Sequence, residues 1–510
     1  MNRSLTCFIC VLLSIVALLL IFSSDETYAQ DVETVRGTEG TSFWMAFPLN
    51  FRDWNEDPTT RTFKPAEPLL MTLAISSSVL TTGYVEAPLL GIRHQFTVIP
   101  GRTAFVTIDT SLQLDPIEKI LPKGVHIVSD EPITVIATSH RHQTTDSYLI
   151  LPESTLGKEY RLVGYRWLAK DLISQGAIVA TENQTTIEIT PTARTLSGKA
   201  NDLPFSIMLN EGEVFNMRAF FDVSKSSDLT GTHITSSKPV AVFSGHNCAY
   251  VPDVAYKACN ILVEQVPPVE TWGTEFVIGR LASRSGYSVR VLASEDSTVV
   301  VEGGDLVATL DAGEFVERTI SDRSIHLNTS KPVLVAQYSH GYTSPDPITA
   351  HADSIGDPMM MFIPPISNYG YAYRFTAPFD GTWKNYATIT ARLGEHEEIA
   401  IGREKISPNV FRRIPGSDFV VAHILVSSGT HTVVSEHPIG MVCYGFGYDE
   451  FKFDAYGNGT AMLAKGAEKE LPEELTEELE DAVEIRSADG ATFKGKVWES
   501  IEMPELESRE

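Results

Sequence analysis

The sequence has few basic residues, few cysteines and no second long hydrophobic run. Its 510 residues contain 40 lysines and arginines against 66 aspartates and glutamates, which gives a net charge of −26. A surface this acidic repels phosphate backbones, so nucleic-acid binding is not expected. After the N-terminal segment no hydrophobic run is long enough to cross a bilayer, which argues against a polytopic membrane protein.

The common signatures of catalytic and nucleotide-binding sites are also missing. The sequence contains no GxSxG, HExxH, P-loop or dinucleotide-binding motif. We therefore expect a protein that is not an enzyme and uses no cofactor. Apolar residues make up 43% of the chain and charged residues 21%, so a sizeable core can be buried.

The first 29 residues follow the pattern of a signal peptide. Arg3 precedes the uncharged stretch Leu5–Phe22, and Thr27-Tyr28-Ala29 supplies small residues at the −3 and −1 positions of a cleavage site. We expect cleavage after Ala29 and a secreted protein. The alternative is an uncleaved membrane anchor, because the uncharged stretch could just span a thinned bilayer.

Two short patterns recur along the chain at intervals of roughly 100 residues. In the first, an aromatic residue that opens a strand follows three positions after a glycine, at Gly40–Phe43, Gly157–Tyr160, Gly273–Phe276 and Gly370–Tyr373. In the second, a proline is predicted to start a strand, where no ladder donor is needed, at Pro132, Pro239, Pro332 and Pro438. Because the two patterns alternate along the chain and recur at similar intervals, the sequence predicts four tandem β-repeats, over residues 37–149, 150–264, 265–360 and 361–450.

Each repeat is predicted to consist of strands. Runs of four to eight β-branched and aromatic residues alternate with turns rich in glycine, asparagine and aspartate. We therefore predict an all-β fold, with six or seven strands per repeat forming sandwich-like layers. Four propeller blades around one axis are the alternative, although a blade needs only about 40 residues.

The tail, residues 468–510, differs from the repeats. It holds 15 acidic and 5 basic residues. Leu471, Leu475 and Leu479 recur at every fourth position, which predicts one short amphipathic helix in a partly helical tail. We expect a solvated appendage rather than a specific docking segment.

Three of the five cysteines lie beyond the predicted signal peptide. Cys248 and Cys259 flank a ten-residue stretch, and in an oxidising compartment a disulfide between them would close a loop. Two unpaired thiols are the alternative. Cys443 lies in an apolar run and is expected to be a buried free thiol.

Five stretches of the chain carry a recognisable pattern: Asp228–Thr232, SSKPVAVFSGHNCAYVPD, LVEQVPPVETWGTEFVIGRL, Gly356-Asp357-Pro358 with FIPPISNYGYAYRF, and GTSFWMAFPLNF near the N-terminus. Together they span about residues 37–450 and resemble IgGFc-binding proteins. The resemblance implies an extracellular adhesion or recognition module without a catalytic site, in a family named for binding the Fc part of IgG. The chain has no cysteine-dense von Willebrand D-type assembly, which argues against a role in a covalent mucus gel.

The predicted disulfide loop is our candidate contact surface for a partner. Within residues 246–259 the candidate contact residues are His246, Asn247, Tyr250 and Asp253. Trp54, in the acidic stretch Asp53–Asp57, is a further candidate, although the simpler interpretation is a loop that packs against the second repeat.

Histidines end three of the predicted strands. If the repeats packed around one axis, His140, His246 and His340 could form a metal or acid–base site with the carboxylates in the loops that follow, such as Asp146. The simpler interpretation is an ancestral histidine that caps its strand, since Phe446 replaces it in the fourth repeat. We therefore expect no metal, and a metal-dependent hydrolase is the less favoured alternative.

Three asparagines, Asn183, Asn328 and Asn458, stand in glycosylation sequons and would carry glycans if the host glycosylates secreted proteins. Taken together, the patterns predict a secreted β-repeat protein that binds an extracellular protein or glycoprotein, with IgG Fc and mucins as candidate partners. A self-associating surface or matrix protein is the second hypothesis.

Overall fold

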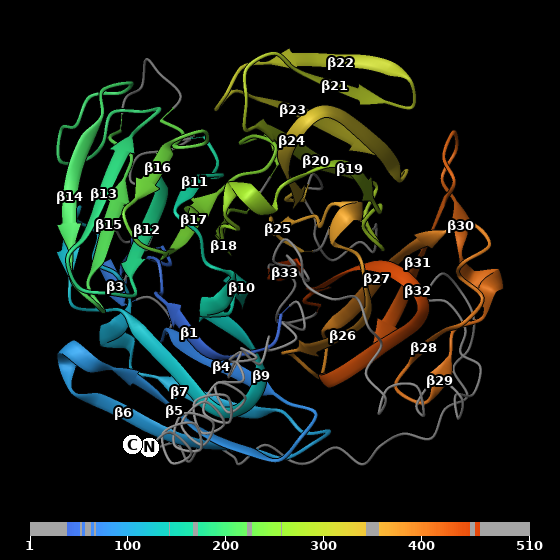
Figure 1. Ribbon diagram of the computed structural model, residues 1–510, viewed down its shortest axis with the longest axis horizontal. Helices are drawn as coiled ribbons and strands as arrows, with labels where there is room; N and C mark the ends of the chain where they lie inside the picture. Colours follow the sequence, from blue (N-terminus) through green and yellow to red (C-terminus); the bar gives the residue numbers. More distant parts are fainter. Residues whose placement is uncertain are drawn as a thin grey trace, which may run out of the picture. The chain divides into compact units, whose positions relative to one another are not determined.

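A computed structural model gives the fold, and its regular structure is almost entirely β-strand (Figure 1). The structure describes residues 38–51, 54–56, 63–65, 68–141, 143–166, 172–221, 227–256, 258–342, 356–448 and 454–459, which fall within one compact unit of the chain, residues 36–510. The all-β prediction is confirmed for these residues. The predicted signal peptide and acidic tail lie outside them. No helix in the described part of the chain is long and apolar enough to cross a membrane.

Short 3-10 helices are the helical elements of the described residues. They are η1 (Pro88–Leu90), η2 (Thr110–Leu112), η3 (Glu153–Thr155), η4 (Val269–Thr271), η6 (Ile366–Asn368) and η7 (Pro408–Val410). Three of them, η3, η4 and η6, directly follow a proline in the leads Leu151-Pro152, Pro267-Pro268 and Pro364-Pro365. The fixed φ of proline favours such a tight turn.

The N-terminal part of the described chain forms one seven-stranded sheet and a separate hairpin. The sheet contains β1 (Gly40–Met45), β4 (Leu70–Ser76), β5 (Thr81–Ala87), β6 (Ile92–Val98), β7 (Ala104–Ile108), β9 (Val125–Arg141) and β10 (Thr144–Ile150). Its order is β6-β5-β9-β4-β7, and β1 and β10 also pair with β9. The hairpin consists of β2 (Trp54–Glu56) and β3 (Phe63–Pro65).

The next stretch of chain forms two sheets. The four-stranded sheet contains β11 (Glu159–Arg161), β13 (Thr185–Thr190), β14 (Phe205–Leu209) and β16 (His233–Ser236). The five-stranded sheet contains β8 (Lys119–Leu121), β12 (Ser174–Ala180), β15 (Val214–Arg218), β17 (Val240–Ala249) and β18 (Asn260–Gln265). Their orders are β11-β16-β13-β14 and β18-β17-β12-β15-β8.

Two further sheets complete the fold. The third stretch forms β19 (Gly273–Ile278), β20 (Gly286–Ala293), β21 (Thr298–Glu302), β22 (Asp305–Leu310), β23 (Phe315–Ser321), β24 (Ile325–Ser339) and β25 (Met360–Phe362). The last forms β26 (Gly370–Ala377), β27 (Lys384–Arg392), β28 (Ile399–Ile401), β29 (Glu404–Lys405), β30 (Arg412–Arg413), β31 (Phe419–Val426), β32 (Gly429–Phe446) and β33 (Ala455–Gly459). Their longest strands, β24 and β32, each pair with four others.

The recurrent strand proline marks the place where a long strand passes from one ladder to another. In β9, residues 125–129 pair with β1 and β5, whereas residues 134–141 pair with β4 and β10. Pro132 lies between these segments, where its missing backbone N–H costs no ladder hydrogen bond. The other three prolines occupy corresponding places, Pro239 between β16 and β17, Pro332 within β24 and Pro438 within β32.

The recurrent glycine–aromatic pattern ties the first strand of a stretch to that bend. In Gly157–Tyr160 the tyrosine hydroxyl accepts a hydrogen bond from the glycine N–H at 2.8 Å and donates one to the carbonyl of Val240 at 2.7 Å. Gly370–Tyr373 makes the same two bonds, the second to the carbonyl of Ile439 at 2.6 Å. Both carbonyls belong to the residue directly after a bend proline.

The same glycines let a proline from a later segment approach the backbone closely. A Cβ built on each glycine would lie far inside contact distance of a proline Cβ, at 2.6 Å for Gly40 and Pro152, 2.5 Å for Gly157 and Pro268, and 2.3 Å for Gly273 and Pro365. The fourth glycine, Gly370, has no such neighbour, and the nearest atom to its built Cβ is the Tyr373 hydroxyl oxygen at 3.4 Å.

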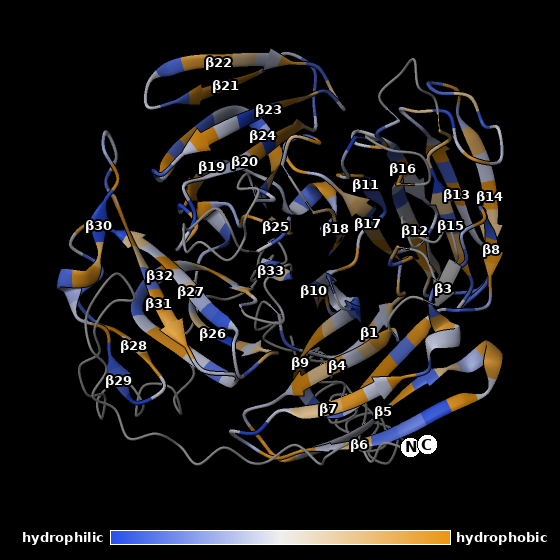
Figure 2. Cartoon of the chain, turned by 180° about the vertical axis from the view of Figure 1, so that it is seen from behind, coloured by the Kyte–Doolittle hydropathy of each residue, from blue (hydrophilic) through white to orange (hydrophobic). Residues whose placement is uncertain are grey.

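Alternation of buried and exposed side chains places the cores. In β13, Ile187 and Ile189 are buried whereas Thr186 and Glu188 between them are exposed, the period of a strand with one buried face. Figure 2 shows hydrophilic residues in the middle of β6, an edge strand whose exposed polar side chains discourage pairing with another chain. Cys443 is a buried free thiol, as predicted, and burial raises its pKa to about 12.

Replacing Gly273 with alanine should destabilise the fold. The new Cβ would overlap Pro365, and relieving the overlap is expected to cost about 1–3 kcal/mol of unfolding free energy. Gly370→Ala is the matched control and should cost less than about 1 kcal/mol, because its Cβ has room. Urea denaturation of both variants measures the difference, and equal stabilities would contradict the role assigned to these glycines.

Candidate functional site

The predicted disulfide is present and closes a loop between two neighbouring strands. Cys248 and Cys259 are joined with an S–S distance of 2.10 Å, and their Cα atoms lie 5.1 Å apart. Cys248 belongs to β17, and Cys259 directly precedes β18, which pairs with β17. We call residues 249–258 the cystine loop.

The tip of the cystine loop is exposed and its flanks are partly covered. Asp253, Val254 and Ala255 are exposed, and 53% of Val254 is accessible to solvent. The Asp253 carboxylate accepts a hydrogen bond from the Ala255 N–H at 2.8 Å, and its carbonyl accepts one from the Tyr256 N–H at 3.1 Å. These bonds hold the tip in a compact turn. Tyr250, a predicted contact residue, is half-buried beside it.

The other two predicted contact residues of this segment lie inside the protein. His246 is 1% exposed and Asn247 2% exposed, both within β17. Burial lowers the pKa of His246 to about 3, so its ring is neutral, and Nδ1 accepts the Cys248 N–H at 3.1 Å. The Asn247 side-chain oxygen accepts the Ile173 N–H at 2.7 Å. These side chains cannot touch a partner at the surface, which corrects their predicted role: they support the base of the loop.

Neighbouring segments clamp the cystine loop on two sides. The Tyr165 hydroxyl donates to the Pro252 carbonyl at 3.2 Å, and the Arg166 guanidinium donates to the same oxygen. From the other side the Gly341 N–H donates to the Val251 carbonyl at 3.0 Å. The loop backbone is thus anchored to the segment after β11 and to the segment after β24.

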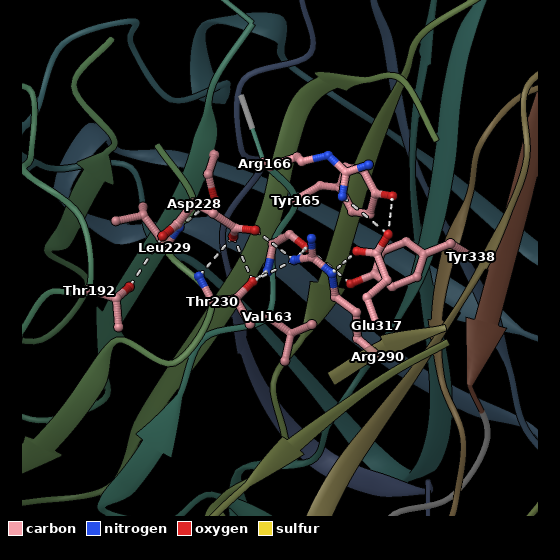
Figure 3. A network of polar contacts seen from close by, with 12 residues as sticks. Val163, Tyr165, Arg166, Thr192, Asp228, Leu229, Thr230, Arg290, Glu317 and Tyr338 are labelled. Atoms are coloured by element: carbon pink, nitrogen blue, oxygen red, sulfur yellow. Dashed lines mark hydrogen bonds and ion pairs between the residues drawn. The ribbon is translucent and has the colours of Figure 1, made fainter. Parts of the chain in front are cut away.

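A buried network of charged residues stands behind this clamp (Figure 3). Arg290 in β20 is 1% exposed, and its Nη1 donates to Asp228 at 2.7 Å while its Nε donates to Glu317 at 2.8 Å. The guanidinium carbon also lies 4.3 Å from the ring centroid of Tyr165 and 4.5 Å from that of Phe315. Planar guanidinium groups suit such combined ion-pair and ring contacts.

Glu317 connects the network to the cystine loop. Its second oxygen and the Pro252 carbonyl share the single hydroxyl proton of Tyr165, at 3.0 and 3.2 Å. The Arg166 guanidinium donates to the same two acceptors, through Nη1 to Glu317 at 3.2 Å and through Nη2 to Pro252. Burial opposes ionisation of Asp228, but Arg290 and two hydrogen bonds from Thr230 outweigh it and lower the pKa of the carboxyl below its usual value. The Asp228 carboxylate therefore stays ionised beside Arg290, and the hydrogen bonds of the network fix the base of the loop.

Four strands from separate stretches of chain meet at a second buried polar centre. β10 contacts β18 and β33, and β25 contacts the same two strands. The Asn260 side-chain amide donates to the carbonyls of Thr145 at 2.7 Å, Pro358 at 2.8 Å and Ala455 at 3.3 Å. Its oxygen accepts the Thr145 N–H at 2.6 Å. One side chain thus bonds to β10, to β33 and to the segment that leads into β25.

Asp146 makes a second set of links at this centre. The sequence predicted it in a loop, whereas it lies in β10 and is fully buried. Its carboxylate accepts the N–H groups of Ser147 at 3.0 Å, Val263 in β18 at 3.1 Å and Gly457 in β33 at 3.2 Å. Burial raises its pKa well above the usual value, although these N–H groups act in the opposite direction.

Three further carboxyl groups are buried at the same centre. Burial raises the pKa of Glu264, of Asp357 and of Asp454, and for Asp454 to about 7. Asp454 accepts the Thr145 hydroxyl at 2.9 Å. Within the described chain, neither carboxylate oxygen of Asp357 has a hydrogen-bond partner, and the nearby Asp454 raises its pKa further.

The remaining predicted residues are not brought together. His140 shares a hydrogen bond of 2.7 Å with Thr145, and His340 shares one of 3.0 Å with Ser288. The His340 ring also lies 5.1 Å from the ring of Tyr256 in the cystine loop. Trp54 lies in β2, opposite Pro65 of β3. Among the residues that the structure describes, no three histidine, cysteine or acidic side chains are placed to hold a metal ion.

The three sequons differ in accessibility. Asn183 and Asn328 are exposed, so a glycan could be attached to either. Asn458 is 2% exposed in β33, and its side-chain oxygen accepts the Ser147 hydroxyl at 3.2 Å. A folded chain cannot accommodate a glycan there, which corrects this prediction.

Sequence reasoning missed Arg290, Glu317 and Asn260. A signal for Arg290 was available, since it interrupts the apolar run Val289–Leu292 inside a predicted strand, and a charge in such a place needs a buried partner. Asn260 follows the second cysteine directly and gave no local signal, because its partners lie 98 to 195 residues away.

Replacing Arg290 with methionine should destabilise the protein strongly. The change keeps the apolar stem but leaves Asp228 buried without its cation, while Glu317 retains Arg166; the expected cost is about 3–5 kcal/mol. The control Arg318→Met removes an ion pair to Glu302 in which the arginine side chain is 39% exposed, and should cost about 0–1 kcal/mol. Urea denaturation distinguishes the two, and a small loss for Arg290→Met would show that the network contributes little.

Asp454 should make stability depend on pH. Its pKa rises from about 4 in the unfolded chain to about 7 in the folded one, so the folded state binds the extra proton between these values. The unfolding free energy therefore falls as the pH rises from about 4 to 7, by up to about 4 kcal/mol. Asp454→Asn removes this ionisation while keeping an acceptor for Thr145.

The variant should consequently be more stable than the parent at pH 8, and the difference should shrink towards pH 4.5. Chemical denaturation at a series of pH values measures it, with the exposed Asp418→Asn as the control. A difference between parent and variant that is constant across the series would contradict the assignment.

Comparisons with known proteins relate this chain to one protein family. A family model described as IgGFc binding protein matches residues 146–445, more than half of the chain. The human IgGFc-binding protein (Homo sapiens) is 25% identical over 424 residues, which cover 81% of this chain. The aligned region corresponds to 7% of the length of that relative.

Proposed function

The chain belongs to the IgGFc-binding protein family, and from this premise we propose that it is a secreted recognition protein that binds a protein or glycoprotein surface without catalysing a reaction. The family match covers both strands that flank the cystine loop and the network behind it. A relative that shares this region is named for binding IgG Fc. IgG Fc is therefore the first partner to test, and mucins are the second.

The observation that carries the proposal is an exposed loop tip on an immobilised base. Asp253, Val254 and Ala255 are exposed, while the disulfide, Tyr165 and Gly341 hold the backbone on either side of them. A loop that is ordered before binding loses little conformational entropy when it binds. An apolar side chain beside a carboxylate at such a tip suits contact with a protein surface.

Secretion is part of the same proposal. The N-terminal segment has the pattern of a signal peptide, and disulfides persist in oxidising compartments outside the cytoplasm. Both features support an extracellular protein.

We further propose that the scaffold consists of four tandem units, with boundaries near residues 37–149, 150–264, 265–360 and 361–450. The same pairing scheme occurs in all four stretches and supports this division. In three of them one long strand contains the bend proline, and it pairs with both the first and the last strand of its stretch. In the second stretch the proline lies between β16, which pairs with the first strand, and β17, which pairs with the last. The last strands are β10, β18, β25 and β33, which meet at Asn260. Between the fourth stretch and the first, Arg374 pairs with Glu39 at 3.1 Å, and both side chains are about one tenth exposed.

Binding of the full protein to intact IgG, with separated Fc and Fab fragments, tests the proposal. We expect saturable binding to Fc and none to Fab. Val254→Asp should weaken this binding at least about tenfold, because a charge replaces the exposed apolar side chain at the tip. Leu306→Asp, at an equally apolar position that is 68% exposed in β22, should leave it unchanged.

Surface plasmon resonance at physiological salt measures both effects. Equal losses in the two variants, or none in Val254→Asp, would exclude the cystine loop as the contact. Absence of Fc binding up to tens of micromolar would exclude IgG as the partner and direct the search to mucins.

A further inference from the structure

A concave site elsewhere in the protein shares no residue with the cystine loop. It is a cavity of about 200 Å³, enough for about seven water molecules. Its walls come from the segment directly after β19, the turn between β23 and β24, and the segment from η7 through β30 to β31 (the strands are labelled in Figure 1). The lining residues are Arg280, Arg323, Ser324, Val410, Arg412, Arg413, Ile414, Pro415, Val421 and His423. We call it the arginine pocket.

Four arginines around one small cavity are unexpected in this chain. The whole sequence has only 40 basic residues and carries a net charge of −26. No aspartate or glutamate is among the residues that line the pocket. Four positively charged side chains therefore line one hollow of an acidic protein, and they can attract an anion there.

The arginines retain donors for a ligand. Arg413 reaches Asp418 only at 3.8 Å, and both side chains are well exposed, so this pair is weak. Arg412 donates to the backbone carbonyls of Asn409 and Phe411, and no carboxylate of the described residues lies within ion-pair distance of it. A guanidinium has five N–H groups, so bonds to one or two carbonyls leave others available.

The remaining two arginines are held in place by acidic groups outside the pocket. Arg280 pairs with Asp322 at 3.2 Å, and Arg323 with Glu302 at 2.6 Å. The Arg280 N–H also donates to the Ser324 hydroxyl at 3.0 Å. These contacts orient the two side chains, so a ligand need not immobilise them itself.

The pocket also has an apolar side. Ile414 and Val421 pack with Val277 and Phe419 in a buried cluster, and Val410 and Pro415 complete the lining. His423 is 5% exposed, and its Nδ1 shares a hydrogen bond of 2.8 Å with Thr388. The lining thus combines hydrogen-bond donors with apolar side chains, a combination typical of sites that bind compact polar ligands.

We propose that the arginine pocket binds an acidic saccharide unit, through a carboxylate or sulfate ester that the guanidinium groups hold. Arginine forms paired hydrogen bonds with planar or tetrahedral oxyanions. The hydroxyls of the sugar would bond to the free N–H groups and to Ser324, and its C–H face would contact Ile414 and Pro415.

The charge of the protein favours a ligand with one charge over a polyanion. A nucleic acid or a highly sulfated polymer would bring many negative charges close to a surface with a net charge of −26 and would be repelled. A ligand with a single acidic group and no other charge is attracted by the arginines of the pocket and is repelled far less by the rest of the surface. This site does not rest on the proposed Fc contact, and either can fail without the other.

Isothermal titration calorimetry of the full protein with monosaccharides tests the proposal. N-acetylneuraminic acid and glucuronic acid supply carboxylates, galactose 6-sulfate supplies a sulfate ester, and galactose is the neutral control. We expect binding of at least one acidic sugar and none of galactose. Which acidic sugar binds identifies the source of the negative charge.

Paired variants assign the binding to the pocket. The double variant Arg412→Gln/Arg413→Gln should weaken it about tenfold or more, because charge-assisted hydrogen bonds are lost. Arg403→Gln is the matched control, since Arg403 is exposed in the same part of the chain and does not line the pocket. Both variants change surface residues, and thermal melting confirms that they fold.

Equal affinity of the parent and the double variant would overturn the proposal. So would equally tight binding of galactose, or of N-acetylglutamate in place of every acidic sugar, because the pocket would then select something other than an acidic saccharide. A fall in affinity with rising salt for the parent, reduced in the double variant, would support it independently.

Discussion

The structure depends on one buried amide, at the place where four strands from separate stretches of the chain meet. Asn260 bonds there to Thr145, Pro358 and Ala455, and the most distant of these partners is 195 residues away in sequence. A carboxamide suits this place because it carries two donors and an acceptor. An apolar residue would leave buried carbonyls unpaired, at about 1–3 kcal/mol each. The position of the last strand of each stretch is therefore set by polar contacts, and hydrophobic packing alone would not specify it.

Buried polar contacts also set the position of the backbone at the base of the cystine loop. Arg290 gains little net stability from Asp228 and Glu317, because all three groups lose hydration when they are buried. Their hydrogen bonds form only in a narrow range of geometries, however, and therefore fix the position of Glu317. Glu317 bonds to the Tyr165 hydroxyl, which also bonds to the carbonyl of Pro252. An exposed tip whose backbone is fixed from below can present the same surface to every partner. Local order at the loop thus follows from a network whose central charges, Arg290 and Asp228, are buried.

The sequence predicted what depends on local pattern and missed what depends on distant contacts. The all-β fold and the disulfide follow from residue type and spacing. The recurrent prolines were expected to start strands, whereas Pro132, Pro332 and Pro438 lie inside the long strands β9, β24 and β32. His246 and Asn247 were predicted to be exposed, since they stand next to a predicted loop. The structure buries both, as the β17 strand continues to Ala249 and is covered on both faces. Polarity alone could not distinguish a surface contact from a buried support.

The distribution of arginine connects the fold to recognition. Arg284 and Arg290 are buried, where their hydrogen bonds join segments far apart in sequence, while Arg412 and Arg413 stand at the rim of a pocket. Because the chain has few basic residues, the arginines that are buried in the interior do not neutralise the acidic surface. The net charge of −26 then keeps anions away in general, and an anion gains only where several guanidinium groups converge. An acidic protein can in this way be selective for an acidic ligand: the unfavourable charge of the whole surface rejects polyanions, and the local charge of one pocket admits a single oxyanion.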